Sequence, residues 1–130
     1  MKRIYFLVAV LIAAIAALIF WFTPKSLIEV YSPKNDSIIT SPVTISGQAR
    51  GFWYFEASFP ARLLDGNGKE IAIIPVQALD EWMTERFVPF STKMEFIAPK
   101  TDTGTLILQK DNPSGLPEHD AEIRIPVRFR

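Results

Sequence analysis

Short runs of alternating apolar and polar residues dominate the chain beyond residue 27, and this period of two predicts β-strands with one buried face. The longest run extends from Trp53 to Leu63. Its odd positions, which we expect to face the core, are all apolar: Trp53, Phe55, Ala57, Phe59, Ala61 and Leu63. The tetrapeptide Asp65-Gly66-Asn67-Gly68 that follows predicts a tight turn, because glycine and asparagine accept positive φ at little cost. The segment is therefore predicted to be a core strand that enters a hairpin.

Six more runs show the same alternation and are separated by residues that favour turns. They cover residues 28–31, 43–49, 70–79, 87–97, 105–110 and 123–129. Seven runs at this spacing predict an all-β sandwich of about seven strands over residues 28–130. Proline removes a ladder donor, so we expect the prolines within these runs at a sheet edge, a bulge or a strand switch: Pro60, Pro75, Pro89 and Pro126. They either protect the edges or leave one open for a partner strand.

The N-terminal segment has a different character. Residues Ile4 to Phe22 contain no charge and follow Lys2 and Arg3, which predicts a transmembrane helix over residues 1–22 with its N-terminus inside. Phe20, Trp21 and Phe22 suit an aromatic belt, and residues 23–27 form a short linker. The alternative is a signal peptide whose cleavage leads to secretion. An uncleaved signal anchor is favoured, because the small residues suited to cleavage, around Ala13 to Ala17, lie inside the apolar run.

Composition narrows the range of partners. The chain has no cysteine, which excludes disulfides and thiolate metal sites. All 14 acidic residues lie beyond Phe22, against 12 basic residues once Lys2 and Arg3 are set aside, so the exported part carries a charge near −2. It shows no basic stripe, and nucleic acid is therefore not an expected partner. Within the predicted membrane helix, Ala9, Ala13 and Ala17 repeat every four residues, a spacing that would allow a weak homodimer.

Several motifs resemble the immunoglobulin-like domain of bacterial spore germination proteins. Their order along residues 27–129 carries the resemblance: Ser32-Pro33, Ser41-Pro42, Gly47-Gln48-Ala49-Arg50-Gly51, Asp65-Gly66-Asn67-Gly68, Trp82 before Phe87-Val88-Pro89-Phe90, Asp111-Asn112-Pro113-Ser114-Gly115 and Ile125-Pro126-Val127-Arg128-Phe129. The resemblance implies an immunoglobulin-like sandwich in a bacterial, extracytoplasmic protein. It carries over no catalytic residue. Here we expect the domain to stand alone behind an N-terminal membrane anchor.

Candidate catalytic or metal-binding chemistry is sparse. The single histidine, His119, lies beside Asp120, but no nucleophile-elbow pattern surrounds Ser114, so we expect no catalytic residue. Oxygen ligands gather at residues 65–70 and again at residues 111–120. Neither stretch has the twelve-residue spacing of a helical calcium loop, and turn chemistry accounts for both. We expect no metal and no cofactor.

Binding is the function that the sequence favours. Alternation places Phe52 and Tyr54 opposite Trp53, either exposed for a sugar or protein partner or covered by a neighbouring loop. The polar loop of residues 111–120 joins the last two strands, and it contributes the other candidate contacts: Asp111, Asn112, Ser114 and His119. The chain is predicted to be a non-catalytic, membrane-anchored, extracytoplasmic binding module of the cell envelope, whose partner is an envelope protein or a cell-wall glycan. The alternative is a structural spacer or accessory subunit without a ligand.

Overall fold

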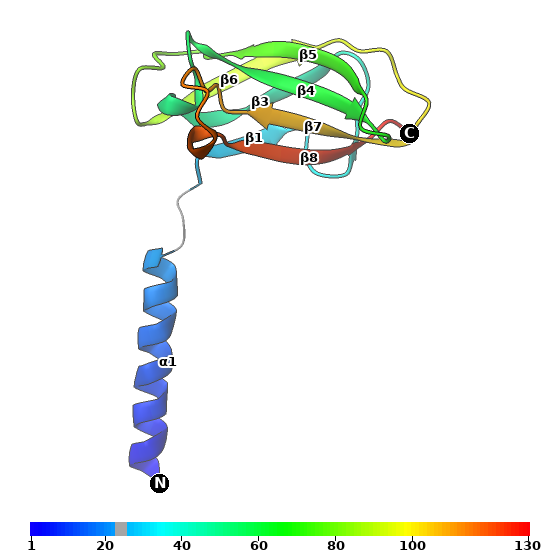
Figure 1. Cartoon of the computed structure of the whole chain (residues 1–130). Helices are drawn as coiled ribbons and strands as arrows, with labels where there is room; N and C mark the ends of the chain where they lie inside the picture. The colour runs from blue at the N-terminus through cyan, green and yellow to red at the C-terminus, as the bar shows by residue number, and fades with distance from the viewer. Residues whose placement is uncertain (23–25) are drawn as a thin grey trace.

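The computed structural model describes the backbone of residues 1–22 and 26–130, and the side chains of residues 1–17 and 26–130. Helix α1 spans Lys2–Phe22 and precedes the β-strands (Figure 1). No helix among the described residues is long and apolar enough to cross a membrane. The predicted belt of Phe20, Trp21 and Phe22 and most of the predicted linker lie outside the described side chains.

Two sheets form the rest of the structure and confirm the predicted sandwich. One sheet has the order β1-β3-β6 and the other β2-β8-β7-β4-β5. Apart from the short parallel pair of β2 with β8, the neighbouring strands are antiparallel. The strands, eight in the described residues, are β1 (Ile28–Ser32), β2 (Ser37–Ile38), β3 (Val43–Arg50), β4 (Ser58–Asp65), β5 (Glu70–Gln77), β6 (Phe87–Met94), β7 (Thr103–Gln109) and β8 (Glu122–Arg128).

The predicted hairpin joins β4 to β5. The backbone N–H of Asp65 donates to the carbonyl oxygen of Lys69 over 2.8 Å, and Gly68 adopts a φ of 81°. The carboxylate of Asp65 accepts the backbone N–H groups of Asn67 and Lys69 at 2.8 and 2.9 Å. These bonds are those of an Asx-type turn, so aspartate and glycine at these positions have a structural explanation.

The strand that leads into this hairpin is shorter than the alternation predicts. Residues Gly51–Trp53 form a 3-10 helix, η1, and β4 begins only at Ser58. Between them Glu56 and Ala57 adopt φ values of 50° and 65°, which an extended strand does not contain. The prediction of one strand from Trp53 to Leu63 is therefore wrong over its first half.

The core lies between the two sheets and is closed by aromatic side chains. Phe59, Ala61 and Leu63 of β4 are buried, as the alternation predicts. The ring of Phe59 packs edge-on against Phe90 of β6 with their centroids 5.2 Å apart. Trp53 is also buried, but it reaches the core from η1, and its indole N–H has no hydrogen-bond partner among the described residues.

The four strand prolines occupy positions where a missing N–H is tolerated. Pro60 and Pro75 lie opposite each other in the β4–β5 ladder, and the pairing of β4 with β7 starts one residue later, at Ala61. Pro89 lies in β6, an edge strand of its sheet. Pro126 of β8 faces β7 and precedes the two residues that pair with β2. Each proline thus lies either in an edge strand or at a residue that is paired with a neighbouring strand on one side only, which agrees with the expectation of an edge or an irregularity.

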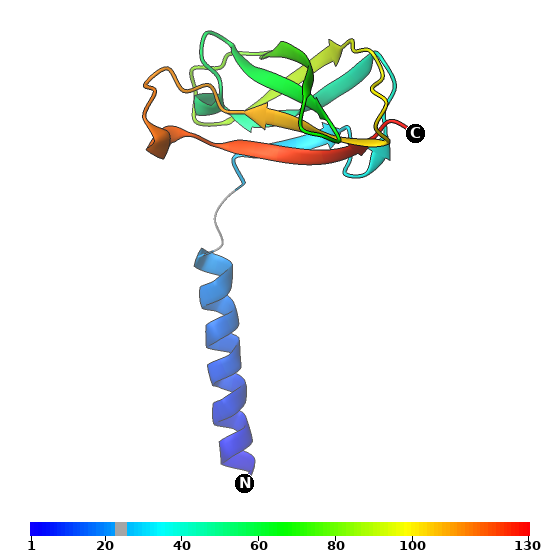
Figure 2. The same ribbon diagram turned by 45° about the vertical axis from the view of Figure 1, so that its right-hand side comes forward.

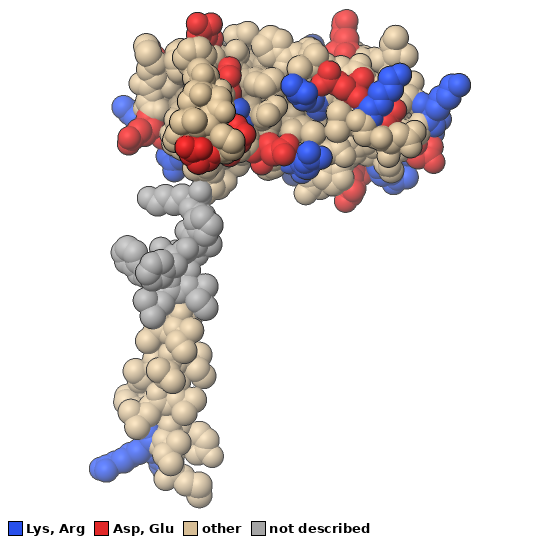
Figure 3. All heavy atoms as spheres, in the orientation of Figure 1, with Lys and Arg blue, Asp and Glu red and all other residues tan. Residues whose placement is uncertain are grey.

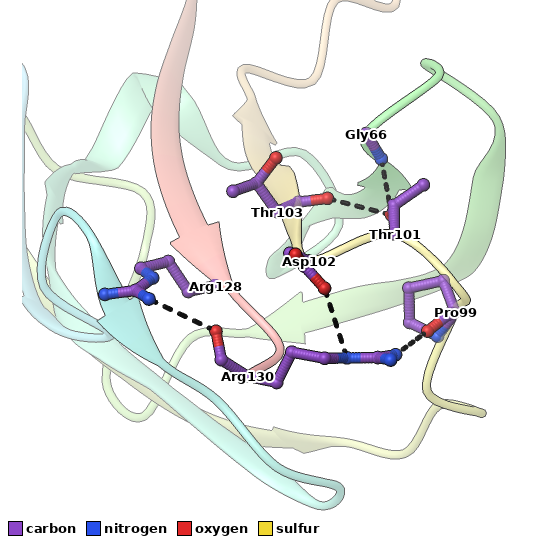
Figure 4. A network of polar contacts seen from close by, with 7 residues as sticks. All are labelled: Gly66, Pro99, Thr101, Asp102, Thr103, Arg128 and Arg130. Carbon is purple, nitrogen blue, oxygen red and sulfur yellow. Dashed lines mark hydrogen bonds and ion pairs between the residues drawn. The ribbon is translucent and has the colours of Figure 1, made fainter.

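A polar network fastens the end of the sandwich that holds the C-terminus (Figure 4). The hydroxyl of Thr101 accepts the backbone N–H of Gly66 over 2.9 Å and donates to the carbonyl oxygen of Thr103. Arg130 forms an ion pair with Asp102 and donates to the carbonyl oxygen of Pro99. These contacts tie the β4–β5 turn and the last residues to the loop before β7.

Candidate functional site

Three loops and the entering chain meet at the opposite end of the sandwich, which we call the entry end. It consists of residues 26–27, where the chain enters the sandwich, and of the loops β3–β4 (residues 51–57), β5–β6 (residues 78–86) and β7–β8 (residues 110–121). The antiparallel pairing places them together, because Ile28 pairs with Ala49 and Arg50 pairs with Phe87. Figure 2 shows the light blue start of the sandwich on the side of the orange β7–β8 loop, away from the C-terminus.

The short helix η1 connects the segments of the entry end. The N–H of Arg50, just before it, donates to the carbonyl oxygen of Leu27 over 2.9 Å. The N–H of Gly51 donates to Arg86 over 3.1 Å, and the carbonyl oxygen of Trp53 accepts the N–H of Asp111 over 3.0 Å. Each loop is therefore fixed to one central turn by a backbone hydrogen bond.

Gly51 allows this close approach. A Cβ at this position would collide with the carbonyl oxygens of Thr84 and Trp82 in the β5–β6 loop. Backbone atoms cannot move aside as a flexible side chain would, so only glycine permits the loop to pack against η1. The glycine is a structural requirement of the entry end.

Phe52 is the aromatic residue that η1 presents to solvent. Its side chain is 45% exposed, which is one of the two alternatives that the sequence leaves open, and the ammonium of Lys110 lies 5.8 Å from the ring centroid. Lys110 also donates to the carbonyl oxygen of His119 over 3.0 Å, within the same β7–β8 loop. Phe52 and this loop, which the sequence identifies separately, are thus brought together.

Tyr54 is not a surface residue, and its predicted position opposite Trp53 is wrong. The side chain is only 3% exposed, and its hydroxyl donates to the carbonyl oxygen of Val88 over 2.8 Å. Burial raises the pKa of the Tyr54 phenol. The 3-10 turn places both Trp53 and Tyr54 in the core. Phe55, which the alternation predicts to face the core, is instead 40% exposed. Tyr54 therefore supports the entry end from beneath.

Asn112 organises the β7–β8 loop. Its side-chain amide donates to the carbonyl oxygen of Leu116 over 2.8 Å and to the carboxylate of Asp120 over 2.7 Å. Its side-chain oxygen accepts the hydroxyl of Ser114 over 2.5 Å. Gly115 has a φ of 69°. The loop is a hydrogen-bonded structure that holds its own shape, as a preformed contact surface requires.

The polar side chains of this loop form hydrogen bonds within the loop itself. Ser114 and Asp120 are both hydrogen-bonded to Asn112, and among the described residues no hydrogen bond joins either of them to the His119 ring. His119 ends the short 3-10 helix η2 (Pro117–His119), where its backbone N–H donates to Leu116 over 3.0 Å. Among the described residues no group of His, Asp and Glu side chains is placed to hold a metal ion.

The structure adds apolar residues that sequence reasoning missed. Ten large apolar side chains are exposed on residues 26–130, and six of them lie at the entry end: Leu27, Phe52, Phe55, Leu79, Met83 and Leu116. Met83 and Leu79 are 74% and 61% exposed. The sequence places Leu79 at the end of a predicted strand and Met83 in a predicted loop, and nothing local shows that separate segments bring such residues to one end.

Acidic residues surround these apolar side chains. The three loops carry seven carboxylates, those of Glu56, Asp80, Glu81, Glu85, Asp111, Glu118 and Asp120, against the two basic side chains of Arg86 and Lys110. Figure 3 shows acidic groups, with basic groups among them, on the tan surface at the end beside the helix. The three ion pairs found in the described part of the chain, Arg62 with Glu70, Arg124 with Glu122 and Arg130 with Asp102, include none of these seven carboxylates. The entry end is both apolar and negatively charged.

Comparison with known proteins gives one match. The family described as the immunoglobulin-like domain of bacterial spore germination matches residues 27–115. No curated protein and no solved structure matches the chain. The matched region runs from the entering chain into the β7–β8 loop and so leaves out β8, although the predicted resemblance extended to Phe129.

Proposed function

We propose that this chain, which belongs to the family described as the immunoglobulin-like domain of bacterial spore germination, is a non-catalytic binding module. We propose further that the module is anchored in the bacterial cytoplasmic membrane. Helix α1 is the anchor, and the sandwich lies outside the cell. The entry end is the surface through which the module contacts its partner.

The proposed anchor rests on the sequence of residues 2–22. The uncharged run after Lys2 and Arg3 is as long as a helix that spans the hydrocarbon layer, and the flanking positive charges favour an N-terminus inside. Five peptide steps separate Phe22 from Leu27, so these residues are at most about 18 Å apart. An anchored chain therefore holds the entry end close to the membrane surface.

The observation that carries the binding proposal is the grouping of exposed apolar residues at this end. Six of the ten exposed large apolar side chains of residues 26–130 lie there. Exposed apolar residues that are grouped and rimmed by polar groups are typical of interaction sites. A spacer without a ligand gains nothing from them, whereas a binding module uses such residues as anchors. This grouping favours a binding module over a structural spacer.

Site-specific photo-crosslinking in living cells tests the proposal. A benzophenone amino acid replaces Phe52 or Leu116 in the full chain, and Tyr31 in β1 or Ile38 near the opposite end serves as the matched exposed control. We expect discrete crosslinked products from the two entry-end positions and none from the controls. Products from all four positions, or from none, would contradict a partner surface at the entry end.

A further inference from the structure

We infer that the partner held at the entry end is a positively charged polypeptide segment with apolar side chains, presented at the membrane surface by another membrane protein. This inference rests on the proposed function and names the chemistry of the partner. Its basis is that one surface combines exposed apolar residues with carboxylates that form no ion pair with the described residues, next to the point where the chain enters the sandwich.

The apolar component comes from different loops fixed to one support. Phe52 lies on η1, Met83 on the β5–β6 loop, and Leu116 on the β7–β8 loop. Because these loops are hydrogen-bonded to η1 or to residues beside it, their positions are set before a partner arrives. A preformed apolar surface costs little ordering entropy on binding and therefore suits apolar side chains of a partner.

The charged component selects a cationic partner. The three loops carry seven carboxylates and two basic side chains, and Arg50 just before η1 adds a third cation that donates to the carbonyl oxygen of Glu85. The described structure gives the seven carboxylates no ion pair. Lys110 already donates to the carbonyl oxygen of His119 and lies over the ring of Phe52. An excess of unpaired negative charge attracts a partner of opposite sign and speeds its approach.

The same charge argues against a lipid surface as the occupant. Phosphate groups of anionic lipids repel the carboxylates, and the apolar residues would have to enter the interface together with them. A polypeptide with lysine or arginine beside apolar residues satisfies both components at once. Its place is at the membrane surface, because the linker keeps the entry end within about 18 Å of the helix end.

Binding of two synthetic peptides to the full chain in phosphatidylcholine nanodiscs tests the inference. In one peptide lysine and phenylalanine are spaced by glycine and serine, and in the other glutamate replaces each lysine. We expect the lysine peptide to bind about tenfold or more tightly than the glutamate peptide, with an affinity that falls as salt is raised. Empty nanodiscs supply the background that is subtracted.

Charge variants provide the matched control. The triple variant Glu81→Gln, Glu85→Gln, Glu118→Gln keeps side-chain acceptors and should lose about fivefold or more of the affinity for the lysine peptide. The far-end variant Asp36→Asn, Glu70→Gln, Glu95→Gln removes equal charge and should bind as the original chain does. Equal binding of the two peptides would overturn the inference, as would an equal loss of affinity for the lysine peptide in both triple variants. Binding of the chain to vesicles containing phosphatidylglycerol in preference to either peptide would also overturn it.

Crosslinking separates failure of this inference from failure of the proposed function. If the benzophenone at Phe52 yields products that persist unchanged in the triple entry-end variant, the surface binds a partner without the charge selection, and only the inference fails. If no product forms at Phe52 or Leu116 in the original chain, the proposed function fails as well. Loss of products in the entry-end triple variant, with retention in the far-end one, supports both.

Discussion

The backbone N–H of Asp111 donates to the carbonyl oxygen of Trp53 over 3.0 Å and thereby joins the β7–β8 loop to the 3-10 turn that carries Phe52. The two residues are far apart in sequence and belong to loops that follow strands of different sheets. Because of this bond, the position of the β7–β8 loop depends on the position of the turn that carries Phe52. The entry end is therefore a single built surface, and its supports can be tested one at a time.

Gly51→Ala should destabilise the fold strongly, because the added Cβ collides with the backbone of Thr84 and Trp82. We expect a loss of about 3 kcal/mol or more in the free energy of unfolding, measured by urea denaturation of the full chain in detergent. Gly68→Ala is the control, since its Cβ meets nothing within 4 Å and only its φ of 81° is strained. That variant should lose about 1 kcal/mol, and an equal loss in both would refute the role of close packing at Gly51.

Tyr54 should make stability depend on alkaline pH. Burial raises its pKa in the folded state above the value of about 10 in an unfolded chain. The contribution is therefore fully present below pH 10 and is lost as pH rises from there toward the folded pKa, by up to about 1.4 kcal/mol per pH unit. Tyr54→Phe should remove this slope from urea titrations, whereas Tyr31→Phe, at an exposed site, should keep it. An unchanged slope in Tyr54→Phe would contradict the assignment.

Asn112→Ala should loosen the β7–β8 loop without unfolding the sandwich. The variant loses the hydrogen bonds that the side-chain amide of Asn112 donates to the carbonyl oxygen of Leu116 and to the carboxylate of Asp120. We expect the amides of Gly115, Leu116 and His119 to exchange with deuterium about tenfold faster, with less than about 1 kcal/mol lost globally. Asn67→Ala in the β4–β5 turn is the control and should leave these rates unchanged. Unchanged exchange in Asn112→Ala would show that the loop is held by other contacts.

The proposed anchor predicts a specific topology. The chain lacks cysteine, so Lys100→Cys introduces a single thiol at an exposed position of the sandwich. A membrane-impermeant maleimide should label it in intact cells, and the mass of the chain extracted from membranes should include the residues from Lys2 onward. Absence of labelling would contradict an outside domain, and a mass that lacks the apolar segment would show that the signal is cleaved.

The positions of the strands and the face that each one buries are the most predictable level of this structure. Phe59, Ala61 and Leu63 are buried as the alternation predicts, because an extended chain keeps its period of two wherever ladder pairing continues. The same pattern fails for Phe55, since Glu56 and Ala57 turn through positive φ and interrupt the strand. Alternation of residue types does not reveal such a turn, because it describes which side chains are apolar and not which backbone angles they adopt.

The candidate site was only partly predictable for a related reason. Phe52 and the β7–β8 loop were identified, but Tyr54 exchanged roles with Phe55, because a 3-10 turn has three residues per turn. Met83 and Leu116 lie in loops without periodicity, and Leu79 ends the alternating run of residues 70–79, so the sequence gives no sign that they share one end. Their grouping follows from tertiary hydrogen bonds to η1 and the residue before it, which only the folded chain displays.

The central claim is that a partner covers the entry end in the native membrane. The accessibility of a cysteine thiol introduced at position 83 tests it most directly. Met83→Cys and, as control, Ile97→Cys at the far end are 74% and 88% exposed positions, and both can be labelled with maleimide. We predict that native membranes slow labelling at position 83 by about tenfold relative to the purified full chain in nanodiscs, while position 97 reacts equally in both. Equal labelling of position 83 in native membranes and in nanodiscs would contradict the claim.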